Sequence, residues 1–133
     1  MLHAKLAEAP YRVDIVTGAH ALVGDEPAEH GGQDAGPSPF DLVLSGLAAC
    51  TLITLRMYAE RKGWAPFHAE GRFRFRQEDG QRLIDRHLQV TGAPDAAAIE
   101  RLAEIAERTP VTLALKAGFT ISTELTEAAA ART

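Results

Sequence analysis

The side chain best suited to covalent chemistry in this 133-residue sequence is a single thiol. Cys50 is the only cysteine, and it lies among apolar residues that include Leu47 and Ile53. A thiolate is a strong nucleophile when a nearby cation, a hydrogen-bond donor or a helix N-terminus stabilises it. In purely apolar surroundings an unpaired cysteine is instead an inert core residue. The residues around Cys50 leave both roles open.

Two charged residues are candidate partners of Cys50. Arg12 lies on a strand expected to pack near the helix that carries the thiol, so it is favoured over Arg56, which is about 120° around that helix from Cys50. Asp41 precedes Cys50 by nine residues, a separation of about 13 Å that places it on the opposite face of a continuous helix. Asp41 can therefore approach the thiol only if the helix bends at Ser45-Gly46 or if Asp41 comes from another chain.

A polar segment from Gly24 to Pro37 precedes this helix. Its sequence, GDEPAEHGGQDAGP, has no periodicity, and loops of this length are usually functional or mobile. It is the first place to look for a site, but no recognised metal-ligand spacing is present, so a solvated loop is favoured and no metal is expected. The acidic residues and histidines concerned are His20, Asp25, Glu26, Glu29, His30 and Asp34.

The apolar pattern around the cysteine predicts one long helix. Ser38 suits the N-cap and Pro39 the first helical position, and the helix is expected to run to about Lys62 and stop at Gly63. From Leu42 to Leu55 it is apolar on every face, so we expect other elements to enclose it. This stretch is shorter than the roughly 20 residues that a membrane span requires.

Alternating apolar and polar residues predict two hairpins, one on each side of the long helix. The first has strands at 11–15 and 19–23, and the second at 67–76 and 82–91. The three arginines of the third strand are expected on a solvated outer face with acidic neighbours.

The last third of the chain is predicted to hold one amphipathic helix and a final strand. The helix starts at Pro94-Asp95, a short turn follows at 111–116, and the strand covers 119–125. The tail from Thr126 is expected to be frayed. This order of elements gives an α+β class, with a single domain at 1–133.

Composition and charge narrow the class of function. The chain is 46% hydrophobic and carries a formal net charge of -4, which predicts a globular protein with neither nucleic acid nor a membrane as a partner. With one cysteine and no apolar leader, a cytoplasmic location is expected. The common nucleotide-binding and hydrolase motifs do not occur, so no cofactor is expected.

The segment from His20 to Tyr58 carries the strongest motifs. It reads H-x-L-x-x-D-E-P, then G-G-x-D-x-G-P-S-P, then an apolar helix with A-C-T and T-L-R-M-Y. With these motifs it resembles the OsmC/Ohr superfamily of thiol-dependent hydroperoxide reductases. The resemblance implies an OsmC-like α+β fold, in which a long buried central helix is wrapped by antiparallel sheets. It also implies an intertwined homodimer with its active site where the two chains meet.

The resemblance also implies site residues. Cys50 matches the cysteine whose thiolate attacks an organic hydroperoxide and becomes a sulfenic acid. A second cysteine, in a C-P-V motif, resolves that sulfenic acid in the family, but this chain has Thr109-Pro110-Val111, so an external thiol reductant would be required. The peroxidases carry a glutamate near the helix start that orients a catalytic arginine. Here Asp41 is the candidate carboxylate and Arg12 the candidate arginine.

Three functions remain open from the sequence. The first is a one-cysteine organic hydroperoxide reductase of the stress response, with Cys50 recycled by an external thiol. The second is a non-catalytic dimer that binds a small lipophilic ligand, with Cys50 in its core. The third is a redox sensor in which Cys50 is oxidised without turnover.

Overall fold

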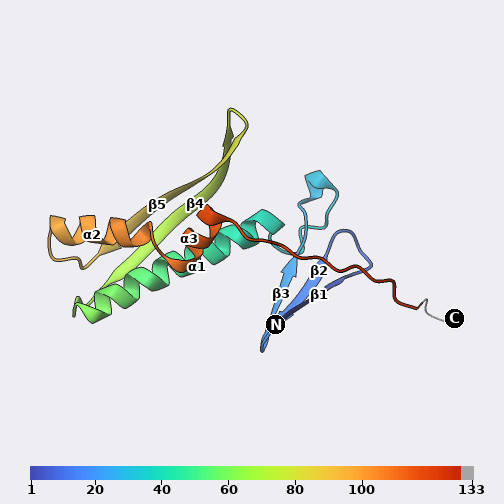
Figure 1. The fold of residues 1–133 in the computed structure, drawn as a ribbon, viewed down its shortest axis with the longest axis horizontal. Helices are drawn as coiled ribbons and strands as arrows, with labels where there is room; N and C mark the ends of the chain where they lie inside the picture. The colour runs from blue at the N-terminus through green and yellow to red at the C-terminus, as the bar shows by residue number, and fades with distance from the viewer. Residues whose placement is uncertain (130–133) are drawn as a thin grey trace.

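The computed structural model describes residues 1–129, which form a three-stranded sheet, a long helix, a hairpin and two shorter helices (Figure 1). Both sheets are antiparallel and the helices do not alternate with the strands, so the predicted α+β class is confirmed. The elements are β1 (Leu2–Leu6), β2 (Val13–Thr17), β3 (His20–Gly24), the 3-10 helix η1 (Ala28–His30), α1 (Pro39–Arg61), β4 (His68–Glu78), β5 (Gln81–Thr91), α2 (Ala96–Ala106) and α3 (Pro110–Ala117).

The N-terminal sheet has the order β1-β2-β3 and includes a strand that the sequence pattern did not predict. In β1, Leu2, Ala4 and Leu6 alternate with polar residues, but leucine, alanine and lysine are also good helix formers and hide the signal. The predicted strands at 11–15 and 19–23 are shifted to β2 and β3. The shift follows from the turn, which uses Gly18 at φ +59° together with Ala19, and from Tyr11 and Arg12, which lie before the strand.

Helix α1 begins and ends as predicted. The Ser38 side chain caps it by accepting a hydrogen bond from the Asp41 backbone N–H at 3.2 Å, and Gly63, at φ +75°, follows its C-cap Lys62. The helix is continuous through Ser45-Gly46, where the Ser45 hydroxyl donates to the Asp41 carbonyl at 2.7 Å. The bend that would bring Asp41 toward Cys50 within one chain is therefore absent.

Strands β4 and β5 form a long hairpin with His68 opposite Thr91 and Glu78 opposite Gln81. The hairpin closes through Asp79-Gly80, both at positive φ, as a tight two-residue turn requires. The strands are therefore one or two residues longer at the turn than predicted. On the outer face Arg74 and Arg76 both bond the Asp85 carboxylate, which confirms the expected acidic neighbour.

The core lies between α1, the hairpin and α2. Leu55, only 1% exposed, packs with Leu102 and Ala106 of α2 and with half-buried side chains of the hairpin. Burying a leucine side chain in this way stabilises the fold by about 2 kcal/mol. By length and composition alone, helix α1 could span a membrane. The core helices of soluble proteins often meet the same two criteria. The packing of α1 on β4, α2 and α3 accounts for the apolar residues on one side of the helix.

The opposite face of α1 is exposed in the single chain. Ile53 and Met57 are 53% and 57% exposed, and Val43, nearly three turns before Ile53, is also exposed. The prediction that other elements enclose this helix on every side is therefore wrong for one chain, which covers only one side.

Two helices follow the hairpin, and the final strand predicted at 119–125 is absent. Helix α2 begins after its cap Asp95, as predicted. The segment 111–116, predicted as a short turn, belongs to the eight-residue helix α3, which Thr109 caps. After Gly118 the chain runs on without pairing to any strand of the described residues, and Phe119, Ile121 and Leu125 are largely exposed. A strand needs a hydrogen-bonding neighbour, which one chain does not offer here. The tail from Thr126 was predicted to be frayed, and residues 126–129 are exposed and belong to no helix or strand. Residues 130–133 lie outside the described range. The single domain at 1–133 stays a prediction.

Candidate active site around Cys50

Cys50 lies at the place where α1 meets the start of α3. Its side chain is half-buried, and its Sγ accepts a hydrogen bond from the Val111 backbone N–H at 3.5 Å. The first N–H groups of a helix have no partner within the helix, so the Val111 N–H is available to an outside acceptor. The same helix end carries a partial positive charge. The thiol thus has a polar neighbour suited to negative charge on sulfur, and it is not sealed among aliphatic side chains.

The start of α3 is fixed by Thr109, the residue that the sequence resemblance aligned with a second cysteine. Thr109 is fully buried, and its hydroxyl accepts the Thr112 backbone N–H at 3.3 Å and lies 2.7 Å from the Thr112 hydroxyl. The Thr109-Pro110-Val111 motif therefore lies directly against Cys50. The threonine side chain caps the helix, and the chain has no second cysteine.

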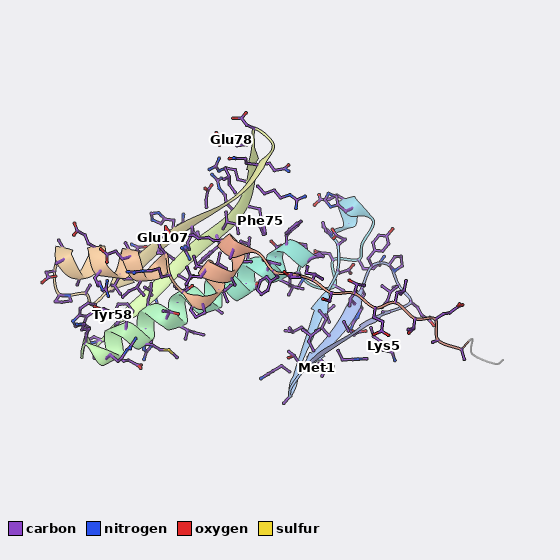
Figure 2. All side chains as sticks on the ribbon, viewed as in Figure 1. Met1, Lys5, Tyr58, Phe75, Glu78 and Glu107 are labelled. Carbon is purple, nitrogen blue, oxygen red and sulfur yellow. The ribbon has the colours of Figure 1, made fainter. Side chains whose placement is uncertain are left out.

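The sequence pattern did not identify a largely buried arginine that bonds Thr51, the residue after Cys50. Arg86 of β5 is only 14% exposed, and its Nη1 donates to the hydroxyls of Thr51 at 3.0 Å and Thr112 at 2.9 Å. Its Nη2 donates to the Ala106 carbonyl at 3.0 Å and to the exposed Glu107 carboxylate at 3.2 Å. Glu107 is the C-cap residue of α2, at the end of that helix (Figure 2).

A signal for Arg86 was present in the strand pattern. In β5 it falls on the same side as Leu88 and Val90, which pack against the core, and it pairs across the hairpin with Phe73. Arg82, near the turn, shares this face, but Arg86 lies further along it between Ile84 and Leu88. An arginine among apolar residues of a strand face is rarely left unpaired when it is buried. That argument identifies a buried arginine but not its helix partners, which depend on the tertiary packing.

The two charged residues predicted for the site are not near Cys50 in the single chain. Arg12 precedes β2 in the N-terminal part and pairs with Asp14 at 2.9 Å. Asp41 lies in the first turn of α1 on a continuous helix, so its side chain faces away from Cys50. Neither residue makes a described contact with the thiol, and both assignments stay predictions.

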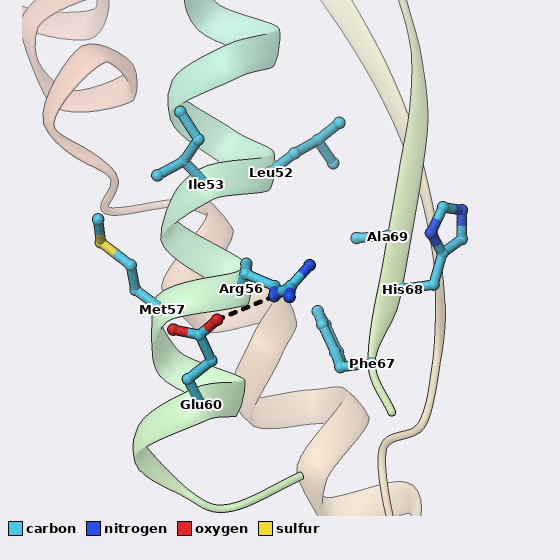
Figure 3. A pocket seen from close by; sticks show the side chains of 8 residues that line it. All are labelled: Leu52, Ile53, Arg56, Met57, Glu60, Phe67, His68 and Ala69. Atoms are coloured by element: carbon cyan, nitrogen blue, oxygen red, sulfur yellow. Dashed lines mark hydrogen bonds and ion pairs between the residues drawn. The ribbon is translucent and has the colours of Figure 1, made fainter. Parts of the chain in front are cut away.

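Arg56 lies in a shallow groove that crosses the surface of α1 and reaches the start of β4. Figure 3 shows its guanidinium between the helix and Phe67, bonded to Glu60 at 3.0 Å. Ile53 and Met57 lie on the side of the helix away from β4. The groove is lined by Leu52, Ile53, Arg56, Met57, Glu60, Phe67, His68 and Ala69, with a volume of about 440 Å³.

The loop that precedes α1 is organised by one carboxylate. Asp25 is only 2% exposed, and its oxygens accept backbone N–H groups at 2.7 to 3.3 Å from four residues. Burial alone would raise the pKa of Asp25, but these donors more than offset it and the pKa is lowered. The donors are Tyr11, Glu26, Gln33 and Ala35.

Two glycines of the loop have no room for a side chain. A Cβ on Gly32 would lie 1.9 Å from the Glu26 carbonyl oxygen, and one on Gly36 would lie 2.3 Å from the Val23 carbonyl oxygen. The shape of the loop therefore explains three residues of its motifs, namely Asp25, Gly32 and Gly36. His30 pairs with Glu26 at 3.5 Å, and within residues 1–129 no group of three or more potential ligands is placed to hold a metal ion.

Comparisons with known proteins agree on fold and family. Residues 31–124 match the family described as OsmC-like protein. No curated protein matches the chain in sequence. Among solved structures, the OsmC-like protein of Mycoplasma pneumoniae is 21% identical with a TM-score of 0.67, over 87% of this chain and 86% of that one.

Two further structures extend the likeness to hydroperoxide resistance proteins. The organic hydroperoxide resistance protein OsmC of Legionella pneumophila is 20% identical, with a TM-score of 0.61 over 87% of this chain and 88% of that one. The organic hydroperoxide resistance protein OhrB of Bacillus subtilis is 24% identical, with a TM-score of 0.58 over 87% and 89%. The predicted OsmC-like fold is thereby confirmed, and the chain belongs to the OsmC-like protein family.

Proposed function

We propose that this protein is a thiol-dependent organic hydroperoxide reductase in which Cys50 is the reacting residue. The observation that carries the proposal is the hydrogen bond from the Val111 N–H to the Cys50 Sγ at 3.5 Å. It gives the only thiol of the chain a donor at a helix N-terminus, where charge on sulfur is favoured. Membership of the OsmC-like family and the likeness to hydroperoxide resistance proteins support the same reaction class.

The first half-reaction oxidises Cys50. The thiolate attacks the outer oxygen of the hydroperoxide, so that an S–O bond forms while the O–O bond breaks. The alkoxide that leaves takes up a proton and departs as an alcohol. The peroxide is reduced by two electrons, and Cys50 becomes a sulfenic acid. The Val111 N–H remains a donor to the sulfur or to its new oxygen.

The second half-reaction needs an external thiol, because Thr109 stands where a resolving cysteine would be. One reductant thiol displaces the sulfenic hydroxyl as water and forms a mixed disulfide with Cys50. A second thiol then attacks that disulfide, restores the Cys50 thiol and leaves as the oxidised disulfide of the reductant. Two thiols are thus consumed for each hydroperoxide reduced.

The working unit in this proposal is a homodimer in the cytoplasm. The exposed face of α1, with Val43, Ile53 and Met57, is apolar, as a surface that packs on a second copy would be. The largely exposed tail with Phe119 and Ile121 would likewise find a strand partner there. In such a dimer, Arg12 and Asp41 of a second copy are the charged residues proposed to complete the site. Nucleic acid and membrane are not among the proposed partners.

The test is stopped-flow oxidation of reduced protein by cumene hydroperoxide, beside hydrogen peroxide and the Cys50→Ser variant. We expect oxidation much faster than that of free cysteine, faster with the organic peroxide, and absent in the variant. Mass spectrometry should then find one added oxygen on Cys50. Oxidation no faster than that of a free thiol would refute the reductase and favour the non-catalytic dimer that binds a lipophilic ligand.

Turnover separates the reductase from a sensor. With excess dithiothreitol or a monothiol, the reductase consumes many equivalents of hydroperoxide per chain. Rapid formation of the sulfenic acid without sustained turnover under any thiol would instead identify Cys50 as a redox sensor.

A further inference from the structure

The guanidinium of Arg86 joins three helices at the point where Cys50 and Val111 meet. It reaches from β5 to Thr51 on α1, to Thr112 on α3 and to the Ala106 carbonyl at the end of α2. Thr51 is fully buried and Thr112 is nearly so. Three of the four acceptors are neutral oxygens, and the fourth belongs to Glu107, whose side chain is largely exposed.

Arg86 bonds the residues that directly follow Cys50 and Val111, the two partners of the hydrogen bond to the thiol. Thr51 follows Cys50 on α1, and Thr112 follows Val111 on α3. One nitrogen, Nη1, bonds both threonine hydroxyls. The separation between Cys50 Sγ and Val111 N therefore depends on a cross-link made one residue further along each helix.

Each threonine is prepared to accept from the arginine. The Thr51 hydroxyl donates to the Leu47 carbonyl at 2.7 Å, which leaves its lone pairs free for Nη1. The Thr112 hydroxyl lies 3.3 Å from the Ala106 carbonyl and 2.7 Å from the Thr109 hydroxyl, and it accepts in the same way. A planar guanidinium can serve such a set of fixed acceptors at once, whereas an ammonium on a flexible stem cannot.

We propose that Arg86 is a positioning residue for the reaction of Cys50: it holds the N-terminus of α3 so that the Val111 N–H stays on the Cys50 sulfur. This inference rests on the proposed function for its catalytic meaning. Whether the surroundings of the Cys50 sulfur depend on Arg86 can be measured without peroxide, through the reactivity of the thiol. Loss of the cross-link lets α3 move away, and displacements of about 1 Å at a reacting group can lower a rate on the order of 100-fold.

The experiment compares Arg86→Met and Arg86→Lys with the control Arg74→Met on the solvated face of β4. We measure the rate constant of Cys50 oxidation by cumene hydroperoxide and the rate of Cys50 alkylation by iodoacetamide across pH. We expect Arg86→Met to slow oxidation by about 10- to 100-fold and to change the alkylation profile. Arg86→Lys should restore only part of both, and Arg74→Met should match the unmodified chain.

A purely structural role predicts a different pattern. Urea unfolding would then show lower stability for Arg86→Met, while the folded fraction would keep the original oxidation rate and alkylation profile. That result overturns the inference. If Arg86→Met does not fold, the variants Thr112→Val and Thr112→Ser test the inference instead. Valine removes the hydroxyl that accepts from Arg86, and serine keeps it. The inference requires slow oxidation in the valine variant and a normal rate in the serine variant, and equal rates refute it.

Failure of the inference and failure of the proposed function are distinguishable. If unmodified protein reacts with cumene hydroperoxide no faster than free cysteine, the proposed function fails, and the alkylation profiles alone then test Arg86. If unmodified protein reacts rapidly and Arg86→Met reacts equally fast with the same profile, only the role of Arg86 is refuted.

Discussion

The Asp25 carboxylate shows how one side chain can shape a whole loop. Its pKa is lowered because backbone donors outweigh the effect of burial. A carboxyl whose pKa is lower in the folded than in the unfolded state stabilises the fold above its unfolded pKa, near 4. That stabilisation is lost as the pH falls through the lower, folded value.

We therefore predict that Asp25→Asn lowers the urea midpoint at pH 7 and removes part of the loss of stability below about pH 4. An amide keeps only one acceptor oxygen for the backbone donors. Urea unfolding at pH 7 and at acid pH measures both effects. Asp34→Asn, in the same loop at φ +54°, is the control, because asparagine tolerates this conformation. An equal effect of the two substitutions would contradict the role of Asp25.

The variant Thr109→Cys tests whether a second thiol can be placed beside Cys50. In Thr109→Cys we expect oxidation by hydroperoxide to end in an intramolecular disulfide with Cys50, because the motif of residue 109 already contacts the Cys50 sulfur. Mass spectrometry after oxidation distinguishes this from an added oxygen. The substitution also removes the cap of α3 and should cost about 1 kcal/mol.

Thr109→Ser is the control for that experiment, since it keeps the capping hydroxyl and adds no thiol. It should yield the sulfenic acid, as the unmodified chain does. Persistence of the sulfenic acid in Thr109→Cys would mean that the two side chains cannot meet within disulfide geometry.

At the scale of elements, the sequence predicted correctly the helices and strands whose ends are marked by capping or turn residues. Helix α1 has Ser38 and Pro39 at its start and Gly63 after its end, and the hairpin has Asp79-Gly80 between two alternating strands. These signals act over a few residues, so sequence alone reveals them. The Cys50–Val111 contact and the hydrogen bonds of the largely buried Arg86 join residues far apart in the chain, and no local pattern determines them.

The elements that were predicted wrongly depend on pairing. The β1 segment has the composition of a helix and becomes a strand by pairing with β2. The segment 119–125 has the alternation of a strand and remains unpaired among the described residues. In both cases the neighbour decides the structure, because an extended segment gains its hydrogen bonds from a partner.

The packing of α1 on α2 gives a prediction at this scale. Leu55→Ala should lower the free energy of unfolding by about 3 kcal/mol, because a fully buried leucine leaves a cavity. Ile99→Ala, at a side of α2 where the isoleucine is 46% exposed, should cost less than half as much. Urea unfolding of both variants checks this, and equal costs would contradict the assignment of Leu55 to the core.

At the scale of the whole molecule, one chain leaves an apolar face of α1 uncovered. We predict that Ile53→Glu shifts the protein from dimer to monomer in sedimentation velocity, because a carboxylate buried in an apolar interface is costly. Ile99→Glu, at a similarly exposed position on α2, is the matched control and should remain dimeric. A monomeric unmodified protein would refute the dimer, and a dimeric Ile53→Glu would exclude this face as its interface.

The buried hydroxyl of Thr109 has a consequence for how the proposed enzyme would fail. Without a second thiol in the chain to trap the sulfenic acid, the lifetime of that species depends on how much reductant thiol surrounds the protein. When hydroperoxide is in excess, a second molecule can oxidise the same sulfur to the sulfinic acid, which thiols do not reverse. Each chain would then be lost permanently, and the surviving fraction would record the ratio of peroxide to thiol to which the protein had been exposed.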